Sequence, residues 1–358
     1  MEAIVGDAKR QHYIPQFILK EWFLEDEQKK KTIYFFEKES NKYFYRRTET
    51  VAYENYLYAY LIDDLFGASE DIRKKFKVDM NLANYDFYDN KGKLIGDTSD
   101  DKNNDYIKIV YLTNRTAISE IKCGGKTLTK AERNTVFTKA ENWRFNGIEK
   151  ALSELESDWK KLVEELKNFR ELYIQKNGNV DKGTEEQYVI SRKEKIIQFL
   201  LFQFIRNPKM KESMSEVYNR IFEILGNILR KEDKDKTIDC AFKNSIVMFI
   251  KQHAKRYADV PIKIYLLDKN QNIFLPEEAF FVIQDKGSKA KMMYFPMTPK
   301  IIISAECNKA KGSRIAIEKL DDSTVDDFNN HIRKNSKKFY ANFDANKKYK
   351  LNYILSNR

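Results

Sequence analysis

The sequence predicts an α+β fold: a helical bundle of about four long helices in the middle, an N-terminal hairpin, and a C-terminal antiparallel sheet with a final amphipathic helix. Three observations predict it. Apolar residues recur at alternating spacings of four and three from Ile148 to Tyr173, which is the pattern of one helix face. Short β-rich runs separated by turn-forming residues follow Pro261. Another pair of β-rich runs lies within residues 31–51.

The N-terminal region opens with RQHYIPQFILKEWF, residues 10–23. We expect an apolar helix to start at Pro15, because the missing N–H of proline costs nothing in a first turn. KTIYFFEKESNKYFYRRTETV, residues 31–51, predicts a hairpin with its turn at ESNK. Residues 52–66 are rich in tyrosine and carry no clear pattern. Residues 85–105 are polar with Gly and Asp, which indicates a loop holding no more than one short hairpin.

The middle of the chain predicts four long helices. The first has a narrow apolar seam that fits the core of an α-rich domain, with an intermolecular coiled coil as the alternative. Its seam is Ile148, Leu152, Leu155, Trp159, Leu162, Leu166, Phe169 and Tyr173. The second runs from about 185 to 206 and stops before Pro208. The third carries Met210, Met214, Val217, Ile221, Leu225 and Ile228, and the fourth carries Ile238, Phe242, Ile246, Phe249, His253 and Tyr257.

The C-terminal region changes character at Pro261. The runs IKIYLL, AFFVIQ, KMMYFP, KIIISA and RIAIEKL are short and β-rich, and the segments between them carry Gly, Asn and Asp. This spacing predicts an antiparallel sheet, which the N-terminal hairpin could join. A last amphipathic helix is expected from about 323 to 341, with the apolar stripe Val325, Phe328, Ile332 and Phe339.

The length allows one large domain or two ordinary ones, and we expect a single domain over residues 1–358, with sub-regions 10–66, 130–258 and 261–358. The chain has 358 residues, and its hydrophobic content of 42% is sufficient for a core. No signal-peptide pattern opens it, and its longest apolar run, residues 196–205, is too short to span a bilayer. Cys123, Cys240 and Cys307 are far apart, which gives no disulfide framework. We therefore expect a soluble, cytoplasmic protein with reduced thiols.

The net charge of +11 is concentrated at the C-terminal end. Residues 286–358 hold 16 Lys and Arg against 7 Asp and Glu, a net charge of +9. Nucleic acid, DNA or RNA, is the commonest partner of such a basic region. Lys334, Lys337 and Lys338 are the candidate nucleic-acid-binding residues. The alternative is an ordinary solvated surface rich in lysine.

His12 is the first candidate catalytic residue. It precedes the predicted helix, whose positive end disfavours an imidazolium, so a neutral ring suited to a general base is expected. The alternative is structural: His12 bonds a backbone carbonyl and holds the N-terminus in place. Arg206 closes the apolar stretch FLLFQFIRNP, where it either interacts with the helix C-terminus or binds an anion while buried.

Other motifs carry less information. PEEAFFVIQDK, residues 276–286, resembles a degraded metal-dependent nuclease core, because acids precede a strand that leads to Gln284 and Lys286. The second acid of such a core is a glutamine here. No P-loop, Rossmann or hydrolase motif is present, and three scattered histidines make no zinc site. No metal site or cofactor is indicated.

RQHYIPQFILKEWF closely resembles the opening signature of a bacterial family known as domain of unknown function 4238. The matching residues are His12, Tyr13, Ile14, Pro15, Gln16, Phe17, Leu19 and Phe23. Later blocks are similar too: FQFIRNP supplies Arg206 and Pro208, FPMTP covers 295–299, and FNNHIRKNSKKFYA supplies Asn329, Asn335 and Tyr340. The resemblance runs from residue 10 to 341. It implies a shared site of His12, Arg206, an acid near Glu278, and Asn329.

One departure from the family pattern concerns that acid. The family shows a Thr-Ser-Asp-Asn-Pro turn before the FPMTP strand, where this chain has LPEEAF, with Glu277 or Glu278 as the acidic replacement. The leading hypothesis is a nucleic-acid-acting effector, a nuclease-like toxin of a defence or mobile-element system. In it His12 is the base and Arg206 holds a phosphate. The alternatives are a non-enzymatic nucleic-acid or protein-binding module and an enzyme on a small anionic substrate.

Overall fold

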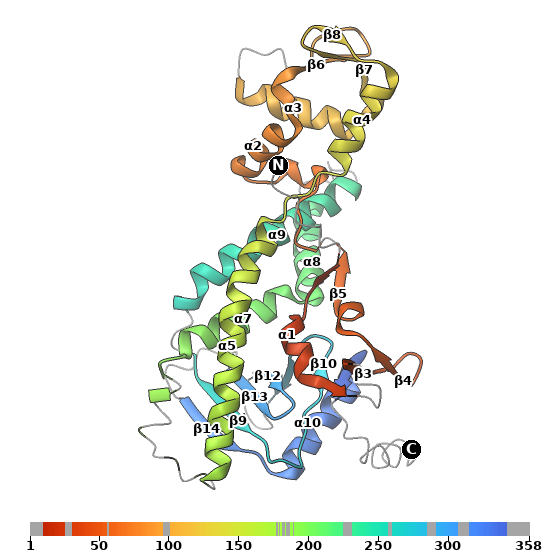
Figure 1. Ribbon diagram of the computed structural model, residues 1–358. Helices are drawn as coiled ribbons and strands as arrows, with labels where there is room; N and C mark the ends of the chain where they lie inside the picture. Colours follow the sequence, from red (N-terminus) through yellow and green to blue (C-terminus); the bar gives the residue numbers. More distant parts are fainter. Residues whose placement is uncertain are drawn as a thin grey trace. The chain divides into compact units, whose positions relative to one another are not determined.

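The computed structural model shows a mixed α+β protein (Figure 1). It describes residues 10–25, 31–55, 57–95, 101–176, 178, 180, 183, 187–188, 190–224, 231–256, 260–284, 291–306 and 315–341. The chain divides into two compact units, and both are discontinuous in sequence. Unit 1 comprises residues 1–9, 56–151 and 211–245, and unit 2 comprises 10–55, 152–210 and 246–358. That the whole chain is one domain stays a prediction.

Unit 1 combines helices with a three-stranded sheet of order β6-β7-β8. Its elements are the 3-10 turn η3 (Ile62–Phe66), α2 (Glu70–Met80), β6 (Tyr85–Asp89), α3 (Asp101–Thr113), β7 (Ile118–Cys123), β8 (Lys126–Thr127) and α4 (Lys130–Glu141). The prediction for residues 85–105 is wrong at the C-terminal end, where α3 begins, while the short hairpin that it allowed is present, with Tyr88 of β6 bridged to Leu94. The first turns of α3 are rich in Asp and Asn, which are typical of loops and helix caps, so the sequence did not predict a helix there.

Unit 1 also contains a buried ion cluster on α9 (Lys231–Arg256). Lys243 is 1% exposed, and its ammonium lies 2.7 Å from the Asp64 carboxylate and 2.9 Å from the Asp239 carboxylate. Lys211 of α8 (Pro208–Ile224) reaches Asp239 as well, at 2.5 Å. A buried lysine needs such partners, because an unpaired ammonium away from water is costly.

Unit 2 contains the predicted long seam, on α5 (Gly147–Gln175), packed against α7 (Lys193–Arg206). Trp159 is 1% exposed, and its ring lies 4.4 Å from Phe202 and 5.8 Å from Phe199 between centroids. The seam is therefore intramolecular core.

The apolar stripe predicted for α8 is partly exposed, at Val217 and Ile221, and Leu225 and Ile228 lie outside the described residues. The side chains of Phe249, His253 and Tyr257 on the fourth predicted helix also lie outside the description. The four-helix bundle stays a prediction. Among the described helices, none has both the length and the apolar character needed to cross a membrane.

The C-terminal sheet of unit 2 has the order β11-β12-β13-β9-β14. Its strands are β9 (Ile262–Leu266), β11 (Phe281–Gln284), β12 (Lys291–Thr298), β13 (Ile301–Glu306) and β14 (Ile315–Lys319). The prediction of a purely antiparallel sheet is wrong at one edge, because β14 pairs with β9 in parallel. Turn spacing cannot reveal this, since a strand and a parallel partner need not be neighbours in sequence.

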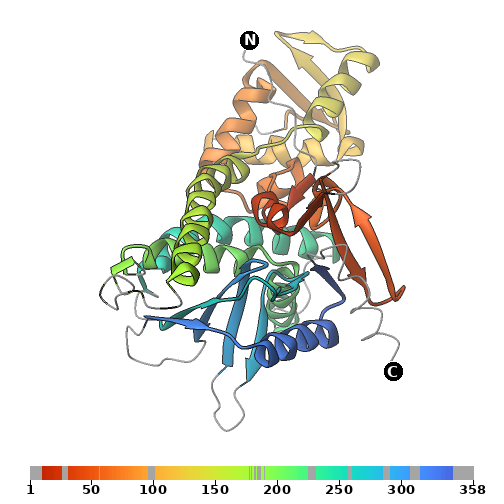
Figure 2. The same cartoon turned by 60° about the horizontal axis from the view of Figure 1, so that its bottom comes forward.

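A second sheet of unit 2 joins both ends of the sequence (Figure 2). Its order is β10-β15-β3-β2, with β4 paired to β3. The strands are β2 (Phe23–Glu25), β3 (Lys31–Glu37), β4 (Lys42–Arg46), β10 (Leu275–Pro276) and β15 (Lys338–Ala341). The predicted hairpin is confirmed as β3 and β4, and in this sheet it pairs with β15 instead of joining the β9–β14 sheet.

Two predicted helices are shorter in the structure. The final helix, α10 (Asp322–Asn335), ends before β15, so the prediction of a helix to residue 341 is wrong. Phe339 and Tyr340 instead pair with strands β10 and β3, and this tertiary pairing overrides the local helical pattern. The opening helix, α1 (Gln16–Leu19), has four residues and continues as the 3-10 turn η1 (Lys20–Trp22).

Candidate functional site

The tight turn after β10 carries the acidic residues that the family resemblance pointed to. Glu277 donates its backbone N–H to the carbonyl of Lys338 at 3.0 Å, and Ala279 donates to Pro276 at 2.9 Å. Ala279 has a φ of +63°, which a residue with a Cβ seldom adopts. The turn therefore fixes Glu277 and Glu278 side by side at the end of a paired strand.

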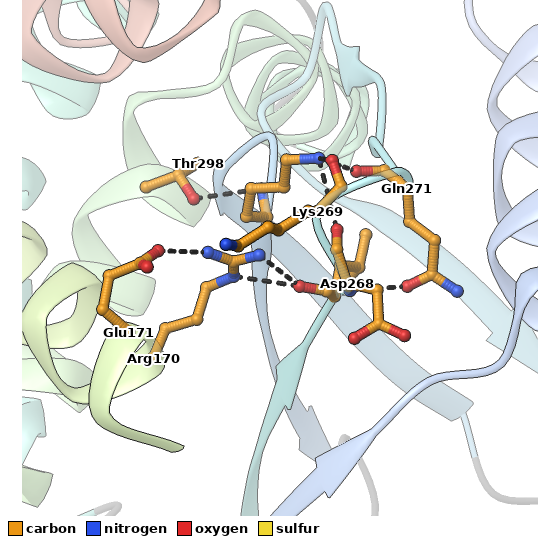
Figure 3. Close-up of polar contacts among 8 residues, drawn as sticks. Arg170, Glu171, Asp268, Lys269, Gln271 and Thr298 are labelled. Carbon is orange, nitrogen blue, oxygen red and sulfur yellow. Dashed lines mark hydrogen bonds and ion pairs between the residues drawn. The ribbon is translucent and has the colours of Figure 1, made fainter. Parts of the chain in front are cut away.

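The loop that leads to this turn is held by side chains from several elements (Figure 3). Arg170 of α5 is buried and donates from Nε and Nη2 to the carbonyl of Leu267, at 2.9 and 2.6 Å. Gln271 accepts from the backbone N–H of Asp268 at 2.8 Å. Lys300 donates its ammonium to three carbonyls of the loop, those of Asp268, Lys269 and Gln271. Converging donors of this kind leave the loop little freedom.

Asn329, a predicted catalytic residue, holds the same segment. Its Oδ1 accepts from the backbone N–H of Phe274 at 2.8 Å, and its Nδ2 donates to the carbonyl of Asn272 at 2.8 Å. Trp22 adds a third bond, from Nε1 to the carbonyl of Ile273 at 3.1 Å. Both the oxygen and the nitrogen of the Asn329 side-chain amide are thus hydrogen-bonded to backbone groups. Asn329 therefore acts to position this segment.

The two carboxylates lie in different surroundings. Glu278 forms an ion pair with Lys209, and its carbonyl accepts from Asn207 Nδ2 at 2.7 Å. Burial raises the pKa of the Glu277 carboxyl, a shift that the nearby Lys338 ammonium opposes and the Glu278 charge reinforces. A carboxyl with a raised pKa keeps its proton to higher pH and can act as a proton donor.

Two phenols, the half-buried Tyr13 and the buried Tyr340, are close enough to these carboxylates to feel their charge. Burial raises the pKa of Tyr13, and the charges of Glu277, Glu54 and Glu278 raise it further. Burial likewise raises the pKa of Tyr340 well above its usual value, and Tyr13, Glu277 and Glu278 raise it further. Both hydroxyls therefore keep their protons and can donate hydrogen bonds. We call Tyr13, Glu277, Glu278 and Tyr340 the carboxyl–phenol cluster.

His12 lies at the end of β1 (Arg10–His12), opposite Tyr53 of β5 (Tyr53–Asn55). It is 8% exposed, and the Gln16 amide nitrogen lies 2.9 Å from its Nε2. The direction of this hydrogen bond follows the tautomer of the ring. The expected effect of a helix dipole on His12 is small, because α1 has four residues.

Arg206 is 2% exposed at the end of α7 and forms an ion pair with Glu156 of α5. Its guanidinium also lies 4.6 Å from the centroid of the Phe202 ring. An incoming phosphate would compete with Glu156 for this charge. The residue that sequence reasoning missed is the adjacent Asn207, which reaches the backbone of Glu278.

The predicted basic residues gather with a lysine from the other end of the chain. Lys38 donates its ammonium to the carbonyl of Lys334 at 2.7 Å and its backbone N–H to the carbonyl of Lys337 at 2.9 Å. Lys338 lies on β15 opposite Glu37, with 3.5 Å between ammonium and carboxylate. We call Lys38, Lys334, Lys337 and Lys338 the basic edge. The rest of the predicted basic region includes residues 286–290, 307–314 and 342–358, which lie outside the described residues.

The predicted catalytic residues thus bind different partners. His12 and Arg206, which we call the buried polar set, contact Gln16 and Glu156, whereas the half-buried Asn329 holds the backbone of residues 272 and 274. Of the suggested nuclease core, Gln284 lies exposed on β11, and Lys286 is outside the described residues. Within the described part of the chain, no three His, Cys, Asp or Glu side chains gather as metal ligands.

Comparison with known families confirms the predicted family. Residues 10–342 match the family described as "Protein of unknown function (DUF4238)", and the chain belongs to that family. No curated protein and no solved structure gave a match to the chain.

Proposed function

We propose that this protein is a nucleic-acid-acting effector and that the basic edge binds the phosphate backbone. The observation that carries the proposal is the convergence of Lys38 with Lys334 and Lys337, residues separated by almost the whole sequence. Lys334 and Lys337 are exposed, so their ammonium groups face solvent and can meet a phosphate without desolvation of a buried charge.

Contacts with the protein backbone also hold the basic edge in an arrangement suited to phosphate binding. Lys38 anchors the end of α10 to the turn after β3, which holds the lysines of α10 and β15 at defined positions. Fixed positions distinguish a binding surface from independently solvated lysines, because phosphates along a nucleic acid are regularly spaced. Glu37 neutralises part of the Lys338 charge, so Lys334 and Lys337 are expected to contribute most.

The test is binding of short DNA and RNA at several salt concentrations by the triple variant Lys334→Gln, Lys337→Gln and Lys338→Gln. The slope of log affinity against log salt should lose about 0.9 for each duplex phosphate contact removed. The matched control replaces Lys160, Lys161 and Lys195, exposed lysines of α5 and α7, and removes the same charge elsewhere. Equal loss in both variants, or binding that salt does not affect, would show that the basic edge is no specific site.

Nuclease-like hydrolysis is a second candidate function, favoured by the carboxyl–phenol cluster. In this proposal a water molecule attacks the phosphorus and gives a proton to the Glu278 carboxylate, while the P–O bond to the leaving oxygen breaks and Glu277 donates a proton to that oxygen. Lys209 pairs with the Glu278 carboxylate, and Asn207 holds the Glu278 backbone carbonyl. A toxin of a defence or mobile-element system would use such an activity. The same cluster could serve an enzyme on a small anionic substrate, which is the remaining alternative.

Expression in bacteria and cleavage of labelled oligonucleotides test the enzymatic proposal. Glu277→Gln and Glu278→Gln should each abolish toxicity and cleavage while the protein remains folded. Glu39→Gln, in the exposed turn between β3 and β4, is the control. If both cluster variants retain full nucleic-acid binding and no cleavage is seen with the wild-type protein, the binding module is the better description.

A further inference from the structure

The strand register places Glu277 beside the basic edge. Pro276 of β10 lies opposite Phe339 of β15, so the next pair in this antiparallel register is Glu277 with Lys338. The backbone agrees, since the N–H of Glu277 donates to the carbonyl of Lys338 at 3.0 Å. Residues directly opposite each other on neighbouring strands share one face of the sheet, with Cβ atoms about 5 Å apart. The side chains of Glu277 and Lys338 are therefore neighbours.

Lys338 lies between two carboxylates. Glu37 of β3 faces it from the other side, with 3.5 Å between the carboxylate and the ammonium. Glu277, Lys338 and Glu37 thus form a row of alternating charge across β10, β15 and β3. One ammonium serves two carboxylates in this row, so the Glu277 charge is only partly compensated. The carboxylate form of Glu277 is therefore sensitive to any further charge that arrives nearby.

Charged and titratable groups face Glu277 from several elements. They are Lys337 and Lys338 of the basic edge, Glu278 of the same turn, Lys209 of α8, and the phenols of Tyr13 and Tyr340. Burial raises the pKa of Glu277, Lys338 opposes this shift most strongly, and Lys337 acts in the same direction. The half-buried carboxyl is less screened by salt than an exposed one. The cations of the basic edge therefore hold down the proton affinity of Glu277.

We propose that a phosphate bound at the basic edge makes Glu277 take up a proton. This inference rests on the proposed function and concerns the regulation of its site. The phosphate brings negative charge and engages the Lys337 and Lys338 ammonium groups, and both effects destabilise the neighbouring carboxylate relative to the neutral acid. The proton comes from the solvent and binds one Glu277 carboxylate oxygen as an O–H group, and no other covalent bond changes.

Proton uptake of this kind prepares the site for the proposed hydrolysis. Glu277 carries its proton while a substrate phosphate is bound, whereas Glu278 keeps its ion pair with Lys209. The occupied site therefore holds one carboxylic acid beside one carboxylate, the pair that general acid–base hydrolysis requires. Without substrate, the cations of the basic edge oppose the protonation of Glu277.

The coupling is reciprocal, so a proton on Glu277 strengthens phosphate binding by the same factor as bound phosphate strengthens proton binding. Affinity for phosphate is then highest at a pH low enough for Glu277 to be protonated in both the free and the bound protein. It falls as the pH rises from the pKa of Glu277 in the free protein to its higher pKa in the complex.

The experiment is isothermal titration calorimetry of the full chain with short DNA and RNA, as single strands and duplexes, between about pH 5 and pH 8. Oligonucleotides of adenine with thymine or uracil, without terminal phosphates, keep a nearly constant charge over this range. Titration in two buffers of different ionisation enthalpy gives the number of protons taken up on binding.

We expect the wild type to take up protons and to bind about 5- to 10-fold more tightly at the lower pH, the low end of the range for coupled sites, because the basic edge faces solvent. Glu277→Gln resembles the protonated carboxyl. It should bind without this uptake, as tightly as the wild type at the lower pH and more tightly than the wild type at the higher pH.

Two variants serve as matched controls. Glu37→Gln removes the other carboxylate beside Lys338, and His331→Gln removes an imidazole of α10 that titrates in the same range. Proton uptake should persist in both. Circular dichroism will establish that each variant is folded. Carbon-13 NMR titration of the Glu277 carboxyl in the wild type, with and without oligonucleotide, measures the same coupling without any variant.

Binding by the wild type without proton uptake, or equal uptake in folded Glu277→Gln, would contradict the inference and leave the basic edge as the binding site. Loss of uptake in a control variant but not in Glu277→Gln would assign the proton to Glu37 or His331 and contradict it as well. If the wild type binds no oligonucleotide, the proposed function fails and this inference fails with it.

Discussion

Arg206 and Lys337 are both cations of unit 2 that the sequence marks for ligand binding, but their environments differ. Arg206 is 2% exposed and paired with Glu156, whereas the side chain of Lys337 is exposed in the link between α10 and β15. The same contrast separates the buried polar set from the basic edge. A cation whose charge is already neutralised inside the protein mainly stabilises the fold, while an exposed cation remains available to a phosphate.

Among changes to the buried residues, Arg206→Ala is expected to have the largest effect on stability. It removes the partner of Glu156 and the packing on Phe202, and should lower the free energy of unfolding by about 3 kcal/mol. Urea denaturation measures this. Arg192→Ala, which removes a more exposed ion pair from the same helix, should cost less than about 1 kcal/mol. A stable Arg206→Ala protein that has lost activity would instead make Arg206 an anion-binding residue.

Asn329→Ala should have the next largest effect. The change leaves a backbone N–H at Phe274 and a carbonyl at Asn272 without their side-chain partner, a loss of about 2 kcal/mol. The neighbouring Asn330 is exposed, and Asn330→Ala should change stability by less than about 0.5 kcal/mol. Thermal unfolding of the two variants gives the comparison. Equal stability for both would remove the positioning role assigned to Asn329.

His12→Asn is expected to cost about 1 kcal/mol, the size of one ordinary hydrogen bond, because the ring contacts Gln16. Binding to nucleic acid should be unchanged, since His12 is buried and is not part of the basic edge. Gln16→Ala should produce a similar loss and serves as the paired variant. A folded His12→Asn protein that loses toxicity or cleavage would show that the histidine is a base, as the family resemblance suggests.

Glu277 should give the smallest effect, visible as a pH dependence of stability. Its folded pKa is raised by burial above the ordinary value of 4.5, so the folded chain holds this proton more tightly than the unfolded chain. Stability is therefore full below about pH 4.5 and declines as the pH rises through the raised folded value. The difference in free energy of unfolding between Glu277→Gln and the wild type should therefore favour the variant more at pH 7 than at pH 4. Urea titrations at both pH values measure it, and an identical difference at the two pH values would contradict the assignment.

Some elements were predictable because their signals are local. The seam of α5 repeats every three or four residues, so residues such as Trp159 and Leu166, two turns of helix apart, lie on the same face. The β3–β4 hairpin was equally readable, since its strands are joined by a short turn. The family was also predicted from the sequence, and Glu277 and Glu278 lie in a turn fixed by backbone hydrogen bonds.

Partners distant in sequence were decided by tertiary structure. KKFYA at the end of the predicted last helix becomes β15, because Tyr340 finds Leu275 on one side and Phe35 on the other. No local pattern encodes those partners. Three other contacts could not be predicted because their partners are also distant in sequence. They are the parallel pairing of β14 with β9, the ion pair of Arg206 with Glu156, and the contact of Lys38 with Lys334. The sequence by itself determined the family, the helix faces and the hairpin, since these depend on residues a few positions apart. Only the folded chain decided which candidate cations are buried and which face solvent, because burial depends on what packs against each residue from elsewhere.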